Sequence, residues 1–170
     1  MRGSVPGTYP PFDHVLGVDG PADQRAEEAT VISIASPVLH EDTTIVGGGT
    51  LSLLVRSNVD DADIAVRIVD EWPVGSPTHP HGYAYRVGHG WLKASHRNGH
   101  TAEAIAPLTP GEWTRVEVDL WPIGYRFAAG HRIRIDIAGA DVPRFAPPAE
   151  PFELTVDLSR STVELPELRA

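Results

Sequence analysis

The strongest constraint on the fold is a pair of neighbouring segments, between Pro107 and Phe145, in which apolar and charged residues alternate. Successive side chains of a β-strand point to opposite faces, so this period predicts two strands, each with one buried face and one face toward water. The expected buried residues are Val116, Val118, Leu120, Ile133, Ile135 and Ile137, and the expected solvent-facing ones are Arg115, Glu117, Asp119, Arg132, Arg134 and Asp136. A second layer must cover the apolar face, so we expect the rest of the chain to complete a two-layer, all-β domain.

The length and composition favour one β-rich domain. A chain of 170 residues is long enough for a substantial core, and its 16 glycines and 16 prolines, without long helical periodicity, indicate many short strands joined by turns. We interpret residues 1–28 as an irregular lead-in or linker and residues 29–170 as the β-sandwich domain.

Charge and cysteine content exclude several classes of function. The formal net charge of -9 argues against a nucleic-acid partner, which requires a clustered basic face. No apolar run is long enough to span a bilayer, so we expect no membrane partner. The sequence has no cysteine, which excludes disulfides and thiolate metal sites and favours a cytoplasmic setting.

Further strands and turns can be assigned along the chain. Composition predicts a strand at Thr30–Ser36, a turn at Gly47–Gly49, and a loop from Trp72 to Gly82. We also expect strands around residues 51–56, 64–69, 83–87 and 90–95, a closing strand at 152–158, and a last half-strand at 163–165.

Two groups of polar residues raise the question of a metal. The acidic turn Asn58, Asp60, Asp61 and Asp63 could hold calcium, and the alternative is a solvated turn. Five histidines, namely His79, His81, His89, His96 and His100, lie within 22 positions. Their spacing is poor for a zinc site, and surface histidines near turns account for the cluster as well. We therefore predict no metal site and no cofactor.

The motifs of a self-contained hydrolase are missing from the sequence. No serine lies in a G-x-S-x-G elbow, and there is no thiol nucleophile. His131 follows Gly130 at a predicted turn, where we expect a structural role rather than general-base catalysis. The prediction is that this chain carries no catalytic residue.

Several segments, taken in order, resemble the C-terminal domain of the cocaine-esterase and X-prolyl dipeptidyl-peptidase family. They are GPADQR (20–25), SPVLHED (36–42), DADIAVRIVD (61–70), GWLKASHR (90–97), PLTPGE (107–112) and FAAGHRIRIDIAGADVPRF (127–145). The GHRIR segment followed by D-x-P-R-F is the most specific of them.

The resemblance implies a jelly-roll β-sandwich of two antiparallel sheets, similar to galactose-binding-like domains. It also implies that the catalytic residues lie in a separate α/β-hydrolase domain, which the jelly roll packs against and whose substrate cleft it helps to frame. Members of the family are several hundred residues long, so the resemblance covers an accessory domain only.

Two functions follow as hypotheses. The first is a non-catalytic docking domain of a serine hydrolase that acts on esters or X-Pro peptides, with Trp72, Tyr83, Tyr85 and Trp91 on the interdomain face; ordinary core packing is the alternative for these aromatics. The second is a free-standing carbohydrate- or ligand-binding jelly-roll module, for which Trp72, His79, His81 and Asn98 are the candidates. An apolar face left without its partner could also drive homo-oligomerisation.

Overall fold

The computed structural model describes residues 23–141 and 150–169. Its elements are η1 (Gln24–Thr30), β1 (Ile32–Ala35), β2 (Thr43–Ser57), β3 (Asp63–Val74), β4 (His81–Lys93), η2 (Ala94–His96), β5 (Thr114–Phe127), β6 (Arg132–Ala138), β7 (Leu154–Val156), η3 (Leu158–Arg160) and β8 (Thr162–Glu164). The described strands pair only in the antiparallel sense, so the predicted all-β class is confirmed. None of the helices in the described ranges is long and apolar enough to cross a membrane.

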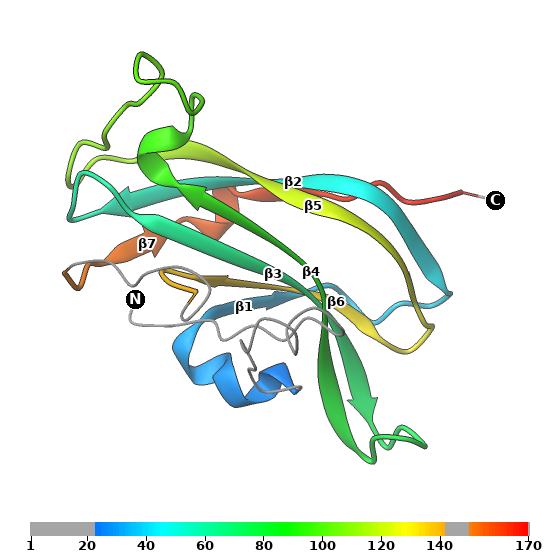
Figure 1. Cartoon of the computed structure of the whole chain (residues 1–170). Coiled ribbons are helices and arrows are strands. Elements are labelled where there is room, and N and C mark those ends of the chain that lie inside the picture. The colour runs from blue at the N-terminus through cyan, green and yellow to red at the C-terminus, as the bar shows by residue number, and fades with distance from the viewer. Residues whose placement is uncertain (1–22, 142–149, 170) are drawn as a thin grey trace, which may run out of the picture.

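The strands form one curled sheet that faces itself across the core. Its order is β1-β6-β3-β4-β5-β2-β7, and β8 pairs with β2. One half, β1-β6-β3-β4, and the other, β5-β2-β7, lie opposite each other, and the β3–β4 hairpin projects beyond them (Figure 1). Between β4 and β5 the pairing consists of the Gly90 and Leu120 positions. A short junction of this kind lets the sheet fold into two layers.

The core lies between these two layers, as the alternation predicts. Val116, Val118 and Leu120 on β5 are buried, while Arg115, Glu117 and Asp119 are exposed. On β6, Ile135 and Ile137 belong to the same core, and Ile133 packs against it. Phe127, Leu53, Val55, Ile64, Val66 and Ile68 supply much of the remaining buried apolar surface.

The far side of β6 differs from the prediction. Arg134 and Asp136 were expected to face water, but they are 2% and 0% exposed. Arg67 on β3 lies beside them, since Arg67 and Asp136 are cross-strand partners. Helix η1 contributes Gln24, which is fully buried and accepts a hydrogen bond from Arg67, and Glu28, which pairs with Arg134. This part of β3 and β6 is therefore covered on both faces, and an ionic cluster lies on the outer one.

Several predicted turns are wrong because the strands are longer than their local patterns. Gly47–Gly49 lies inside β2, where the register with β5 shifts at a bulge and Gly47 has a φ of +123°. Strand β3 continues through Trp72 to Val74, and β4 runs without a break through both of the segments predicted separately. Similarly, β5 continues to Phe127.

At the end of the chain, the predicted closing strand is reduced to β7 and η3, whereas the last half-strand is confirmed as β8.

Candidate functional site

Asp70 is the centre of a buried polar cluster at the projecting end of the β3–β4 hairpin. This residue is 1% exposed, and its Oδ2 accepts hydrogen bonds from Trp72 Nε1 and from Tyr125 Oη, each at 2.9 Å. Its Oδ1 lies 2.8 Å from His131 Nδ1. A buried carboxylate must be satisfied by donors, and these three residues come from three different strands or turns. Asp70 thus ties β3, β5 and the start of β6 together.

Aromatic rings surround this carboxylate. Trp72 packs against His131 and His79 with ring centroids 4.9 and 4.8 Å apart, and His79 stacks on Tyr83 at 4.3 Å. Tyr83 continues to Tyr85, whose centroid is 6.5 Å away, and Tyr85 continues to Tyr125 at the same spacing. We call Trp72, His79, Tyr83, Tyr85, Tyr125 and His131 the hairpin cluster. It brings together three of the four aromatic residues predicted for a functional face.

The cluster perturbs the acid–base behaviour of two tyrosines. Burial raises the pKa of the Tyr125 phenol, and the hydrogen bond to Asp70 raises it further. Burial also raises the pKa of Tyr83, with smaller effects of Asp23 and Tyr85 in the same direction. Both effects favour the neutral form of the phenols.

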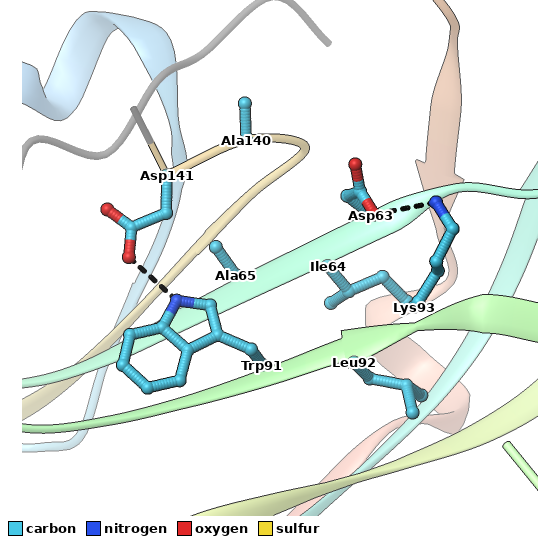
Figure 2. A pocket seen from close by; sticks show the side chains of 8 residues that line it. All are labelled: Asp63, Ile64, Ala65, Trp91, Leu92, Lys93, Ala140 and Asp141. Atoms are coloured by element: carbon cyan, nitrogen blue, oxygen red, sulfur yellow. Dashed lines mark hydrogen bonds and ion pairs between the residues drawn. The ribbon is translucent and has the colours of Figure 1, made fainter. Parts of the chain in front are cut away.

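Trp91, the fourth predicted residue, lies elsewhere. It is eight positions from Tyr83 along β4, roughly 26 Å at the usual rise of a strand. Its ring contacts His89 at 4.1 Å and the exposed Trp121 at 5.7 Å, and its Nε1 donates to Asp141 Oδ2 at 2.7 Å. A pocket of about 350 Å³ opens beside it, lined by Asp63, Ile64, Ala65, Trp91, Leu92, Lys93, Ala140 and Asp141 (Figure 2). The predicted face is therefore two separate surfaces.

The segment that precedes β1 contacts the start of β4, next to the hairpin cluster. Asp23 caps η1 by accepting from Arg25 N, and it also accepts from Ala84 N at 3.2 Å. Arg25 in turn donates to the carbonyl of His81. Although burial alone would raise it, the hydrogen bonds from Arg25 and Ala84 hold the pKa of Asp23 below its ordinary value. The start of β4 is thereby fastened to the lead-in segment.

The histidines that suggested zinc are dispersed over the fold. His79 belongs to the hairpin cluster and His89 to the Trp91 cluster, whereas His96 and His100 approach each other, with their Nδ1 atoms 3.0 Å apart. Within residues 23–141 and 150–169, no group of three or more histidines and carboxylates could hold a metal ion.

The acidic turn that suggested calcium makes contacts within the protein. Asp61 and Asp63 flank Lys93 at 3.2 and 3.3 Å, and Asp61 also accepts from Ser95 N. Asn58 accepts from Glu153 N. Asn98, proposed as a ligand contact, lies exposed in the loop after η2.

Sequence reasoning missed the two residues that organise these surfaces. Asp70 follows the mostly apolar segment IAVRIV, and an acid beside such a segment is itself a signal of a buried hydrogen-bonding site. Trp121 follows the alternating stretch of β5 and is 58% exposed, which marks it as a surface aromatic. Its exposure is not visible from sequence, because it depends on which strands lie beside β5.

The comparisons with known proteins agree on one type of domain. Residues 6–167 match the family described as the X-Pro dipeptidyl-peptidase C-terminal non-catalytic domain. The chain is 30% identical over 139 residues to a provisionally named serine esterase of Mycobacterium tuberculosis, covering 73% of this chain and 21% of that protein. It is 25% identical over 131 residues to the cocaine esterase of a Rhodococcus species, covering 76% of this chain and 21% of the esterase.

Solved structures support the fold. An α-amino acid ester hydrolase superposes with a TM-score of 0.77 at 20% sequence identity, and the match covers 86% of this chain and 27% of that one. An aminopeptidase from a Thaumarchaeota archaeon gives a TM-score of 0.73 at 24% identity, with the same coverage. The chain thus spans about a fifth of the length of the first two curated relatives. On the extent of the family match, this chain belongs to the family of X-Pro dipeptidyl-peptidase C-terminal non-catalytic domains.

Proposed function

We propose that this domain packs against an α/β-hydrolase domain and frames its substrate cleft, within a serine hydrolase that acts on esters or X-Pro peptides. The family match and the named relatives support a hydrolase as the parent protein. The observation that carries the proposal is the hairpin cluster, a set of partly exposed aromatic rings, three of which bond to one buried carboxylate.

The hairpin cluster suits docking better than free exposure. Val74, at the end of β3, is 80% exposed, and Trp72, Tyr83 and Tyr85 are each half-buried beside it. Interfaces between domains commonly bury about 600 to 1,500 Å², and aromatic residues supply much of their contact area. Because Asp70 fixes the Trp72 ring by a hydrogen bond and Tyr83 packs against that ring, little side-chain entropy would be lost on docking.

The test compares the chain alone with the longer polypeptide that includes the coding region preceding Met1. Hydrogen–deuterium exchange is measured by mass spectrometry on both. We expect backbone amides of residues 72–85 to become more protected in the longer protein, and Val74→Asp to abolish that protection without changing the stability of the isolated chain. Leu168→Asp is the matched control, since Leu168 is 62% exposed and lies in the C-terminal segment.

Two results would contradict the docking proposal. One is a preceding coding region without a hydrolase domain, and the other is unchanged exchange at residues 72–85 in the longer protein. Self-association of the isolated chain through the same face is a further expectation. It should be detected by sedimentation and should be lost in Val74→Asp.

A further inference from the structure

The pocket beside Trp91 lies at the opposite end of the β3–β4 hairpin from the hairpin cluster. Asp63 begins β3 and Lys93 ends β4, while Ala140 and Asp141 follow β6. Figure 2 shows the Trp91 indole nitrogen directed at Asp141 on one side of the pocket and Lys93 reaching Asp63 on the other. The pocket therefore has polar groups at two ends and an apolar middle.

An aromatic surface forms one wall and extends outside the pocket. The Trp91 ring contacts Trp121 in an edge-on arrangement with an interplanar angle of 88°, and Trp121 is 58% exposed. Asp141 fixes the Trp91 indole by accepting its N–H at 2.7 Å. A fixed indole presents a flat apolar surface at little entropic cost, which suits stacking against a ring.

The charges around the pocket restrict the ligand. An anion would meet the carboxylates of Asp63 and Asp141, and a cation would meet the ammonium group of Lys93. Burial alone would lower the pKa of Lys93, but Asp63 and Asp61 beside it raise that pKa. A pure hydrocarbon would remove all these groups from water without compensation. Hydroxyl groups both donate and accept hydrogen bonds, so they fit carboxylates at one end and an ammonium–carboxylate pair at the other.

The size of the pocket limits the ligand to one ring. Ligand sites commonly range from about 300 to 1,000 Å³, and this pocket, at about 350 Å³, is at the small end. We propose that the Trp91 pocket binds a single neutral, hydroxyl-bearing ring, of which one sugar unit is the representative. This site is independent of the proposed docking function, since it uses none of the residues of the hairpin cluster.

The experiment is an NMR titration of the isotope-labelled 170-residue chain with methyl β-D-glucopyranoside and methyl β-D-galactopyranoside. The Trp91 indole N–H, identified by its loss in Trp91→Phe, is expected to shift saturably with at least one glycoside. A dissociation constant on the order of 1 mM is expected for one ring. Sorbitol is the matched ligand control, because it has hydroxyl groups but no ring, and it should produce no saturable shift.

Protein variants separate stacking from general surface effects. Trp91→Ala should weaken binding at least about tenfold, and Lys93→Met should weaken it severalfold, since the ammonium group donates to a hydroxyl. Trp113→Ala is the control, because Trp113 is 40% exposed but does not line the pocket. If Trp91→Ala does not fold, Lys93→Met decides, since the Lys93 side chain is half exposed.

Three results would overturn the proposal. They are the absence of a saturable shift with both glycosides, an equal response to sorbitol, and tighter binding of benzyltrimethylammonium than of either glycoside, which would make the pocket a cation site.

Discussion

Arg134 and Asp136, two residues apart on β6, form a bidentate ion pair on the outer face of the sheet. Arg134 Nε lies 3.0 Å from Asp136 Oδ1, and Arg134 Nη2 donates to Oδ2 at 3.0 Å. Asp136 also accepts from Ser33 Oγ at 2.6 Å and lies 3.3 Å from Arg67 Nη2. One fully buried carboxylate thus serves two buried guanidinium groups and joins β1, β3 and β6.

Removing the charge of Asp136 should therefore be costly. Asp136→Asn leaves Arg67 and Arg134 buried without their shared counter-charge, and breaking a buried ion pair from one side typically costs about 3 to 5 kcal/mol. We expect a drop of this size in the free energy of unfolding measured with urea. Asp119→Asn, on the exposed face of β5, should change it by less than about 0.5 kcal/mol. Equal stability of the two variants would show that the outer cluster is not a structural element.

The Asp70 cluster predicts a specific dependence on alkaline pH. The folded protein keeps the Tyr125 phenol protonated, because burial and the bond to Asp70 raise its pKa above the ordinary value of 10. The stabilising contribution is then fully present below pH 10 and is lost as pH rises toward the folded-state pKa. At neutral pH, Tyr125→Phe should lower the free energy of unfolding by about 1.5 kcal/mol, the low end for a bond to a charged group, since the ring is partly exposed.

The measurement for this prediction is a series of urea unfolding curves at rising pH. The difference between the wild-type chain and Tyr125→Phe should narrow above pH 10. Tyr85→Phe serves as control, because it keeps the ring contacts with Tyr83 and Tyr125 and leaves all three bonds to Asp70 in place. A difference that stays constant with pH would argue that the Tyr125–Asp70 bond does not govern this region.

The contact between Asp23 and the Ala84 amide should be broken by acid. The pKa of Asp23 lies below its ordinary value of 3.8, because the hydrogen bonds from Arg25 and Ala84 outweigh the effect of burial. The contribution of a carboxylate with a lowered pKa is present above the unfolded-state value and is lost as pH falls through the folded-state value. We expect the Ala84 amide resonance to move with a midpoint below pH 3.8. In Asp23→Asn this pH-dependent shift of the Ala84 resonance should disappear. If the shift persists in that variant, a group other than Asp23 causes it.

Local sequence patterns predicted one half of this architecture well and the other poorly. The alternation on β5 specifies its buried and exposed faces correctly, because Arg115, Glu117 and Asp119 on one face remain exposed to solvent. On β6 the same alternation misleads, since η1 supplies Gln24 and Glu28 to cover Arg67 and Arg134. The residues in these two contacts lie 43 and 106 positions apart in the chain, so a local pattern cannot reveal that they meet.

The functional surfaces show the same limit. Trp72, Tyr83 and Tyr85 could be selected because bulky aromatics flank a predicted turn, but the separation of Trp91 from them follows from β4 being one continuous strand. The role of Asp70 requires knowledge that Tyr125 and His131, 55 and 61 positions away, arrive beside it. Composition identifies candidate residues, whereas the sheet topology decides which of them share a surface.

The junction of the two layers at Gly90 gives the sharpest test of this topology. A Cβ at Gly90 would lie 2.5 Å from the Asp119 carbonyl oxygen and 3.1 Å from the Leu120 side chain, so Gly90→Ala forces the backbone of β4 away from β5. Overpacking typically costs about 1 to 3 kcal/mol, and contact with backbone leaves little room for relief. Gly124→Ala is the matched control, since nothing lies within 4 Å of its added Cβ and alanine restricts the unfolded chain. We expect urea unfolding to show Gly90→Ala destabilised and Gly124→Ala unchanged or slightly stabilised, whereas equal stability of the two would mean that β4 and β5 do not approach closely at this junction.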